Sequence, residues 1–236
     1  MNENSLPFKP VERACLIAAL RLRGASNQLA TATGSIQHRL ELAWRTYLCE
    51  LDMTSFPKYD RDAFVAVQFV ISPLLEKKIS LEQALSKERA WDLAEKLLWI
   101  ADEIGESFVC GRQKFFSSLA PKPEPLDGQS RARREPPDER LVELERTFSL
   151  GVYELVKADG SLSDRLSSAW NNHIRNFPTK SVPAYFSRSL ENLHDQFNHL
   201  NMADEAVQLL VYDIVLLREL IREAATVDHY RWSIGL

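Results

Sequence analysis

Apolar residues recur at intervals of three and four along most of the chain, which is the period of helices that bury one face. The clearest examples are residues 35–51 and 161–177. The stripe of the first consists of Ile36, Leu40, Ala43, Trp44, Tyr47, Leu48 and Leu51, and that of the second of Leu162, Leu166, Ala169, Trp170, Ile174 and Phe177. The pattern predicts an all-α protein.

The same period predicts three further helices in each half of the chain. They cover residues 10–29, 57–71 and 86–104 in the first half and residues 137–158, 183–199 and 201–220 in the second. Pro73 is expected to end the helix before it, because proline cannot continue a helix. Gly105 is expected to interrupt its helix, with a helical tail at 106–116. The stripe of the last helix runs through Leu209, Leu210, Ile214, Leu217 and Leu220.

One stretch of the sequence occurs twice. Gly34–Trp44 and Gly160–Trp170 share the pattern G-S-[IL]-x-x-R-L-x-x-A-W. At the offset that aligns Gly34 with Gly160, eleven residue pairs between Leu29 and Phe64 are identical, whereas chance pairing at ordinary composition gives about two. We therefore predict a tandem duplication of one four-helix module.

The duplication divides the chain into three parts. The first copy covers residues 8–116, a linker rich in proline and charge covers 117–136, and the second copy covers 137–229. The fourth helices align only at another offset, which pairs Ala90 with Ala206. The first copy therefore has an insert at 73–85 that the second copy lacks.

The residues shared by the two copies are interpreted as structural. They are Gly34, Ser35, Arg39 and Trp44 in the first copy and Gly160, Ser161, Arg165 and Trp170 in the second. The glycine can adopt positive φ and the serine after it caps the helix. The tryptophan lies in the middle of the stripe, which favours a core anchor over a ligand-stacking role. The arginine can pack its stem along the apolar edge while its guanidinium pairs with a carboxylate or a carbonyl.

The repeat also resembles a known group of sequences. The segment Leu29–Leu40, the Ser55-Phe-Pro57 that follows it and the helix from Ser86 to Ile104 are similar to small, uncharacterised, all-helical bacterial proteins of about one module's length. This resemblance implies a shared fold and a bacterial or phage setting, and it implies no catalytic residues. The present chain departs from the group in being doubled.

Composition restricts the class of protein further. The chain has 236 residues, of which 45% are hydrophobic and 26% charged, as in ordinary globular proteins. Its formal net charge of −4 argues against a dedicated nucleic-acid binder. Three scattered cysteines without metal-type spacing suit free thiols in a reducing cytoplasm, and no signal-peptide pattern or long apolar run is present. We expect a cytoplasmic protein without cofactor or metal.

Candidate catalytic residues are few. Arg188 and His194 fit the loose arginine-to-histidine spacing of HEPN-type helical ribonucleases, as do Arg222 and His229, although about one such match is expected by chance. A metal site from His194, Asp195 and His199 is weaker, because residues five apart do not share a helical face.

Three functions remain after this survey. The favoured one is a non-enzymatic adaptor or structural subunit that binds a protein partner, or itself, through two similar modules. The alternatives are the ribonuclease and a nucleic-acid-binding accessory subunit that uses arginines on one helix face. Arg131, Arg133 and Arg134 of the linker could also touch phosphate. Aromatic and cationic residues alternate without a core-like period in the first copy's tail, which predicts a binding surface there. Its candidates are Phe108, Arg112, Phe115 and Phe116, and the next candidate is the C-terminal Tyr230-Arg-Trp232.

Overall fold

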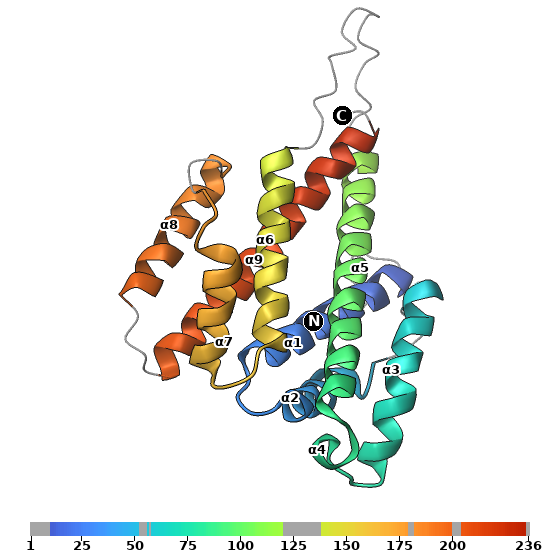
Figure 1. The fold of residues 1–236 in the computed structure, drawn as a ribbon. Coiled ribbons are helices and arrows are strands. Elements are labelled where there is room, and N and C mark those ends of the chain that lie inside the picture. The colour runs from blue at the N-terminus through green and yellow to red at the C-terminus, as the bar shows by residue number, and fades with distance from the viewer. Residues whose placement is uncertain are drawn as a thin grey trace, which may run out of the picture. The chain divides into compact units, whose positions relative to one another are not determined.

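The regular elements of the protein are all helices in the part of the chain that the structure, a computed structural model, describes (Figure 1). That part comprises residues 10–51, 56, 58–119, 138–178, 182–199 and 204–234; for 10–15, 58–59, 106–119, 184 and 230–234 it comprises the backbone only. The prediction of an all-α protein is confirmed. The chain divides into two compact units, Met1–Phe108 and Val109–Leu236, and each is described by itself.

The first unit contains α1 to α4 and most of α5. The bounds are α1 Pro10–Thr31, α2 Ile36–Ala43, a π-helical segment Trp44–Leu48, α3 Lys58–Glu76, α4 Leu81–Ala84 and α5 Lys87–Leu119. The second unit has the same order of elements without a counterpart of α4. Its bounds are α6 Glu139–Lys157, α7 Leu162–Ala169, a π-helical segment Trp170–Ile174, α8 Ala184–Asn198 and α9 Asp204–Ile234.

The turns into α2 and α7 have the same conformation. Gly34 and Gly160 adopt φ values of 94° and 97°, which side-chain-bearing residues rarely adopt. Ser35 Oγ then accepts a hydrogen bond from the backbone N–H of His38, at 3.2 Å. Ser161 forms a reciprocal capping box with Asp164. Each cap satisfies one of the unpaired donors at the start of its helix.

Both helices then change to π-helical hydrogen bonding at the shared tryptophan. The backbone N–H of Cys49 donates to the carbonyl of Trp44, and that of Arg175 donates to the carbonyl of Trp170, both at 2.9 Å. The side chain of Trp44 is buried and stacks on Phe64 with ring centroids 5.6 Å apart. The sequence pattern predicted an unbroken α-helix here. The structure differs, because these hydrogen bonds join residues five apart in place of four.

Trp170 is also buried but has different ring neighbours. It stacks on Phe197, with centroids 4.3 Å apart, whereas Trp44 stacks on a phenylalanine nearer the start of the following helix. The rings of His194 and Trp170 are in an edge-to-face contact, with centroids 4.8 Å apart. Trp44 and Trp170 occupy corresponding positions, but the aromatic residues that pack on them come from different positions of the following helix.

The shared arginines are buried and bond to the end of the preceding helix. Arg39 Nη1 donates to the carbonyl of Leu29, and Arg165 Nη1 donates to the carbonyl of Leu155, both at 2.8 Å. The sequence left open whether the guanidinium pairs with a carboxylate or a carbonyl, and in both units it donates to a carbonyl. Burial lowers the pKa of Arg165 to about 10, so its side chain stays charged at neutral pH.

Three sequence-based helix ends differ from the structure. α3 continues through Pro73 to Glu76; the proline is exposed, so the carbonyl that loses its helical donor can bond to water. The helix ends at Glu76, and Lys78 just after it has a φ of 58°. This residue belongs to a Schellman motif in which the Ile79 N–H donates to the carbonyl of Leu74 at 3.0 Å.

The other two differences are helices that are longer than predicted. α5 passes through Gly105 without interruption, because one glycine costs a helix only about 1 kcal/mol and the neighbouring Ala101 and Ile104 are buried. α9 extends to Ile234, so the C-terminal segment that showed no clear period is helical. Residues 201–203, where this helix was predicted to open, lie outside the described part of the chain, as does most of the predicted linker.

The insert of the first unit packs on α2. Ser35 Oγ donates to the carboxylate of Glu82 on α4, and Glu41 of α2 accepts from the backbone N–H of Leu81 at 2.9 Å. Leu81 is fully buried. In the first unit, the capping Ser35 therefore bonds to a carboxylate from α4. In the second unit, the capping Ser161 bonds to the carboxylate of Asp164, which belongs to the capped helix α7 itself.

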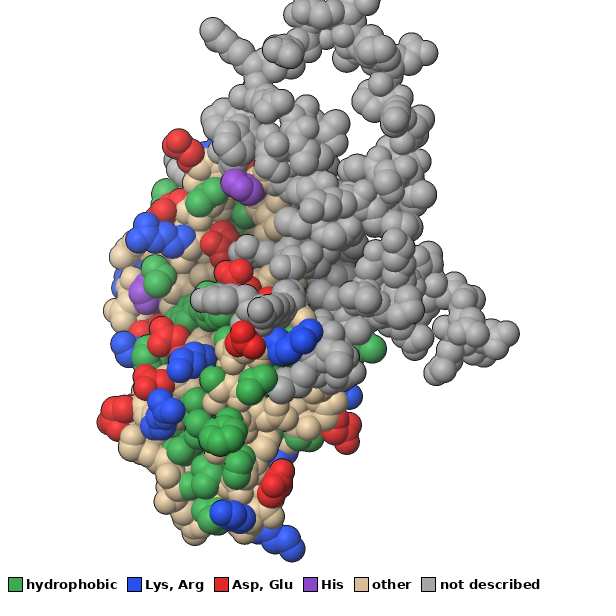
Figure 2. Space-filling model, turned by 90° about the vertical axis from the view of Figure 1, so that its right-hand side faces the viewer, with side chains coloured by type: hydrophobic (Ala, Val, Ile, Leu, Met, Phe, Trp, Pro, Cys, Tyr) green, Lys and Arg blue, Asp and Glu red, His purple; other side chains and the backbone are tan. Residues whose placement is uncertain are grey.

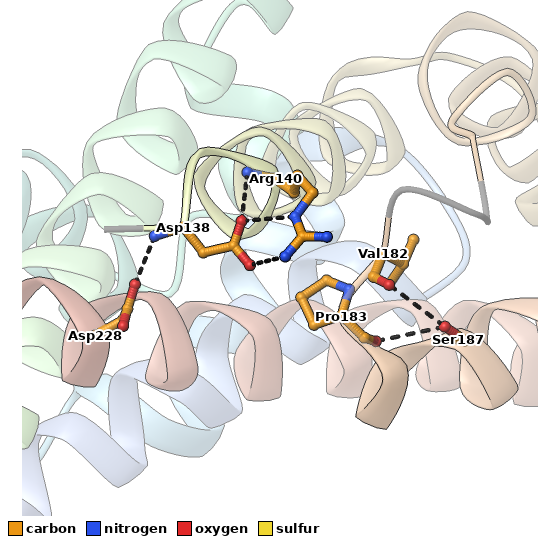
Figure 3. Close-up of polar contacts among 6 residues, drawn as sticks. All are labelled: Asp138, Arg140, Val182, Pro183, Ser187 and Asp228. Carbon is orange, nitrogen blue, oxygen red and sulfur yellow. Dashed lines mark hydrogen bonds and ion pairs between the residues drawn. The ribbon is translucent and has the colours of Figure 1, made fainter. Parts of the chain in front are cut away.

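The start of α6 is attached to α9 (Figure 3). The backbone N–H of Asp138 donates to Asp228 Oδ2 at 2.7 Å, while the Asp138 carboxylate accepts from Arg140 Nε and Nη2 at 2.9 and 2.7 Å. The hydrogen bond from the Arg140 side chain is the main cause that lowers the pKa of Asp138. Nearby, Ser187 Oγ approaches the carbonyls of Val182 and Pro183 at the start of α8.

Candidate binding site between α8 and α9

A groove lies between α8 and α9 in the second unit, where the two helices are in contact. Its volume is about 200 Å³. The lining residues are Ser189, Asn192, Leu193 and Gln196 from α8 and Asp213, Leu216, Leu217 and Leu220 from α9. We call this the α8–α9 groove. Its α8 wall is mainly uncharged and polar, and its α9 wall is mainly apolar.

The apolar wall continues along α9 as an exposed stripe. Leu209, Tyr212, Leu216 and Leu220 are large hydrophobic residues with exposed side chains. Their spacings of three and four place them on one side of the helix. We call these four residues the α9 stripe. Contiguous exposed apolar surface of this kind is typical of interaction sites.

The exposure of the α9 stripe is a difference between the two units. At the offset that pairs Ala90 with Ala206, the counterparts of Leu209, Leu216 and Leu220 are apolar residues of α5. These counterparts are Leu93, Ile100 and Ile104, and all three are buried. Leu209, by contrast, is 67% exposed. The sequence period predicted that Leu209 and Leu220 belong to the apolar stripe of this helix together with Leu210, Ile214 and Leu217; the last three are buried, but Leu209 and Leu220 are exposed, so the prediction was wrong for these two residues.

The first unit exposes apolar side chains on another helix. Phe69 of α3 is 79% exposed, and Val65, one turn earlier, is also exposed. Figure 2 shows hydrophobic side chains gathered on the lower part of the face it presents, at the height of α3 and α4 in Figure 1. The positions of α8 that correspond to Val65 and Phe69 are Glu191 and Asp195, both exposed and acidic. We call Val65 and Phe69 the α3 patch.

The structure does not bring together the arginine and histidine considered for a ribonuclease. Arg188 is exposed on α8, whereas His194 packs against Trp170, and a six-residue separation places two side chains about 120° apart around a helix. His194 Nε2 is buried without a hydrogen-bond partner among the described residues. Its pKa is lowered by burial, an effect that the nearby Asp195 opposes.

The histidine environment gives a prediction for pH. Because the pKa of His194 is lower in the folded state, its protonation favours unfolding. The contribution of the neutral ring to stability should be complete above the unfolded pKa of about 6.5 and should be lost as the pH falls from there to the folded pKa. We expect the thermal midpoint of the full chain to fall less over this range in His194→Leu than in the wild type.

The matched control for this experiment is His199→Leu, since His199 lies on the same helix with an exposed side chain. This variant should keep the wild-type dependence on pH. Equal pH dependence in wild type and His194→Leu would show that the buried ring does not couple protonation to folding.

Other candidate residues are placed as follows. Within the described part of the chain, no group of three or more His, Cys, Asp or Glu side chains could hold a metal ion, so His194, Asp195 and His199 do not form such a group. The side chains of the predicted binding residues lie outside the described part of the structure. These residues are Phe108, Arg112, Phe115 and Phe116, together with Tyr230, Arg231 and Trp232. Their backbones belong to α5 and α9, and the linker arginines are not described at all.

Comparison of the chain with protein-family models, with curated proteins and with solved structures finds no match. The resemblance of the repeat to small bacterial helical proteins therefore stays an expectation. Within the described residues, no helix is long and apolar enough to cross a membrane.

Proposed function

We propose that the protein is a non-enzymatic helical adaptor that binds protein partners, as a subunit of a bacterial multiprotein complex. The observation that carries this proposal is that each unit exposes large apolar side chains on a helix face, the α3 patch in one and the α9 stripe in the other. Exposed apolar faces on otherwise polar helices are characteristic of surfaces that a protein partner covers. The bacterial setting rests on the resemblance of the repeat.

The two exposed faces do not occupy corresponding positions. The α3 patch corresponds to the acidic residues Glu191 and Asp195 of α8. The leucines of the α9 stripe are exposed, whereas their counterparts in α5 are buried. The units therefore differ where they meet solvent, although both keep the glycine–serine turn and the buried arginine and tryptophan. An adaptor of this kind binds two different surfaces, and linking them in one chain raises the effective concentration of the second contact.

The nucleic-acid alternative is less well supported. It depends on arginines arranged on an accessible helix face, but several arginines are in the core. Arg39, Arg165, Arg218 and Arg222 are buried. Arg218 and Arg222 both bond to Glu219, at 2.8 and 2.7 Å. These side chains are not positioned to neutralise phosphates.

Site-specific crosslinking in cells of the native host tests the proposal. A photoreactive amino acid is placed at position 69 in the α3 patch or at position 216 in the α9 stripe. The control position is 150, because Leu150 of α6 is also exposed and apolar but belongs to neither surface. We expect discrete crosslinked polypeptides at 69 and at 216, identified by mass spectrometry, and none of them at 150.

The same experiment can contradict the proposal. Crosslinks at positions 69 and 216 that do not exceed those at position 150 would remove both surfaces as protein-binding sites. Crosslinks to nucleic acid in place of polypeptide would favour the accessory subunit instead.

A further inference from the structure

Acidic residues accompany the α9 stripe. Asp213 lines the α8–α9 groove, and Glu205 and Glu223 are exposed at the two ends of the stripe. Their positions relative to Leu209, Leu216 and Leu220 place all three carboxylates on the same side of α9 as the leucines. The basic residues of this part of α9, Arg218 and Arg222, are buried on the opposite side.

The α8 wall adds no charge to this surface. Its lining residues Ser189, Asn192 and Gln196 are neutral, and Arg188 is not among the residues that line the groove. Asp213 makes no ion pair or hydrogen bond with another described residue. The surface therefore combines a leucine-lined floor with the unneutralised carboxylate of Asp213, which favours an apolar partner surface that also carries positive charge.

We propose that the α8–α9 groove binds an amphipathic helix of a partner protein, with a lysine or arginine of that helix facing Asp213. This inference rests on the proposed adaptor function and specifies the partner's chemistry. The stripe from Leu209 to Leu220 extends about 16 Å along α9, which matches about three turns of a bound helix. A helix satisfies its own backbone hydrogen bonds, so it can place apolar side chains on the leucines without leaving polar backbone groups unpaired.

Charge distinguishes this occupant from two others. In a two-fold contact between copies of the chain, each stripe would face itself. Asp213 lies near the middle of the stripe, so the carboxylates of the two copies would meet and repel each other. An anionic lipid surface would likewise be repelled by the carboxylates of Asp213 and Glu205. A cationic helix is the occupant that the charges favour.

Two designed peptides provide the test. Both are amphipathic helices with the same leucine stripe, and they differ only in the residues beside the stripe, which are lysine in one and glutamate in the other. Each peptide carries a fluorophore, and its binding to the full-length protein is measured by fluorescence polarisation. We expect the lysine peptide to bind at least about tenfold more tightly than the glutamate peptide.

Variants of exposed residues locate the binding site. Leu216→Ser should weaken the lysine peptide by about tenfold or more, and Asp213→Lys should reverse the preference between the two peptides. Leu150→Ser is the matched control, an exposed leucine of α6 in the same unit, and should leave both affinities unchanged. Thermal unfolding of each variant verifies that it is folded.

Several results would overturn the inference. These are no binding of either peptide, equal binding of both, or a preference that Asp213→Lys leaves unchanged. A wild-type dimer that Leu216→Ser dissociates would assign the stripe to a second copy, and Leu216-dependent binding to phosphatidylserine vesicles would assign it to a membrane. If crosslinked polypeptides are still found at position 216 in any of these cases, the adaptor function stands and only the helical, cationic partner is excluded.

Discussion

Trp170→Ala should lower the free energy of unfolding of the second unit by about 3 to 5 kcal/mol. The side chain is almost fully buried, it stacks on Phe197 and it makes an edge-to-face contact with the ring of His194. The substitution removes this apolar area from the core and leaves a cavity lined by aromatic rings that cannot collapse to fill it. Trp44→Ala should have an effect of the same size in the first unit, where Phe64 loses its stacking partner.

Chemical denaturation followed by circular dichroism measures this loss, and hydrogen exchange assigns it to a unit. Trp170→Ala should reduce the protection of α6 and α7 while α1 and α2 keep that of the wild type. Phe69→Ala is the control, because that ring is exposed and its loss should change stability by less than about 0.5 kcal/mol. A loss below about 1 kcal/mol in either tryptophan variant would mean that the ring adds little to the core.

The second large effect concerns the buried arginines. Arg39→Ala should cost about 2 to 4 kcal/mol, because it removes the donor to the Leu29 carbonyl at the end of α1 and leaves a cavity where the side chain lay. Arg165→Ala should cost a similar amount in the second unit, where the same bond reaches Leu155. Arg39→Lys should be intermediate, since lysine retains the charge but not the planar fork of donors.

Urea titration of these variants gives the comparison, with Arg188→Ala as the control because Arg188 is exposed. The decisive variant is Arg39→Met, which keeps much of the side-chain volume without the charge. If Arg39→Met were as stable as the wild type, the cost of burying the guanidinium would equal what its hydrogen bonds contribute, and the structural interpretation of the arginine would be wrong.

Hydrophobic period and the repeat were enough to place most helices, because both depend on local residue spacing. They could not reveal the π-helical segments, since the segments after Trp44 and Trp170 share no further residue that signals the change. Pro73 misled the prediction, because its effect on a helix depends on whether water reaches the carbonyl one turn earlier. That accessibility is a property of the folded chain.

The candidate site was missed for a related reason. A stripe of leucines shows which face of α9 is apolar, but not whether another element covers it. Leu93 and Leu209 are the same residue type at paired positions, and one is buried while the other is exposed. The difference depends on which elements lie beside each helix, and one sequence does not give that information.

The π-helical segments also bear on the order of events in the history of the chain. A turn closed by a hydrogen bond over five residues contains one residue more than an ordinary helical turn. Each unit has this longer turn at the same place, beginning at the tryptophan of an Ala-Trp pair, at Trp44–Leu48 and at Trp170–Ile174. Two independent insertions at the same place would be a coincidence. If the two units arose by the duplication that the repeat predicts, one insertion before the doubling accounts for both turns, and the single module before the doubling already contained the longer turn.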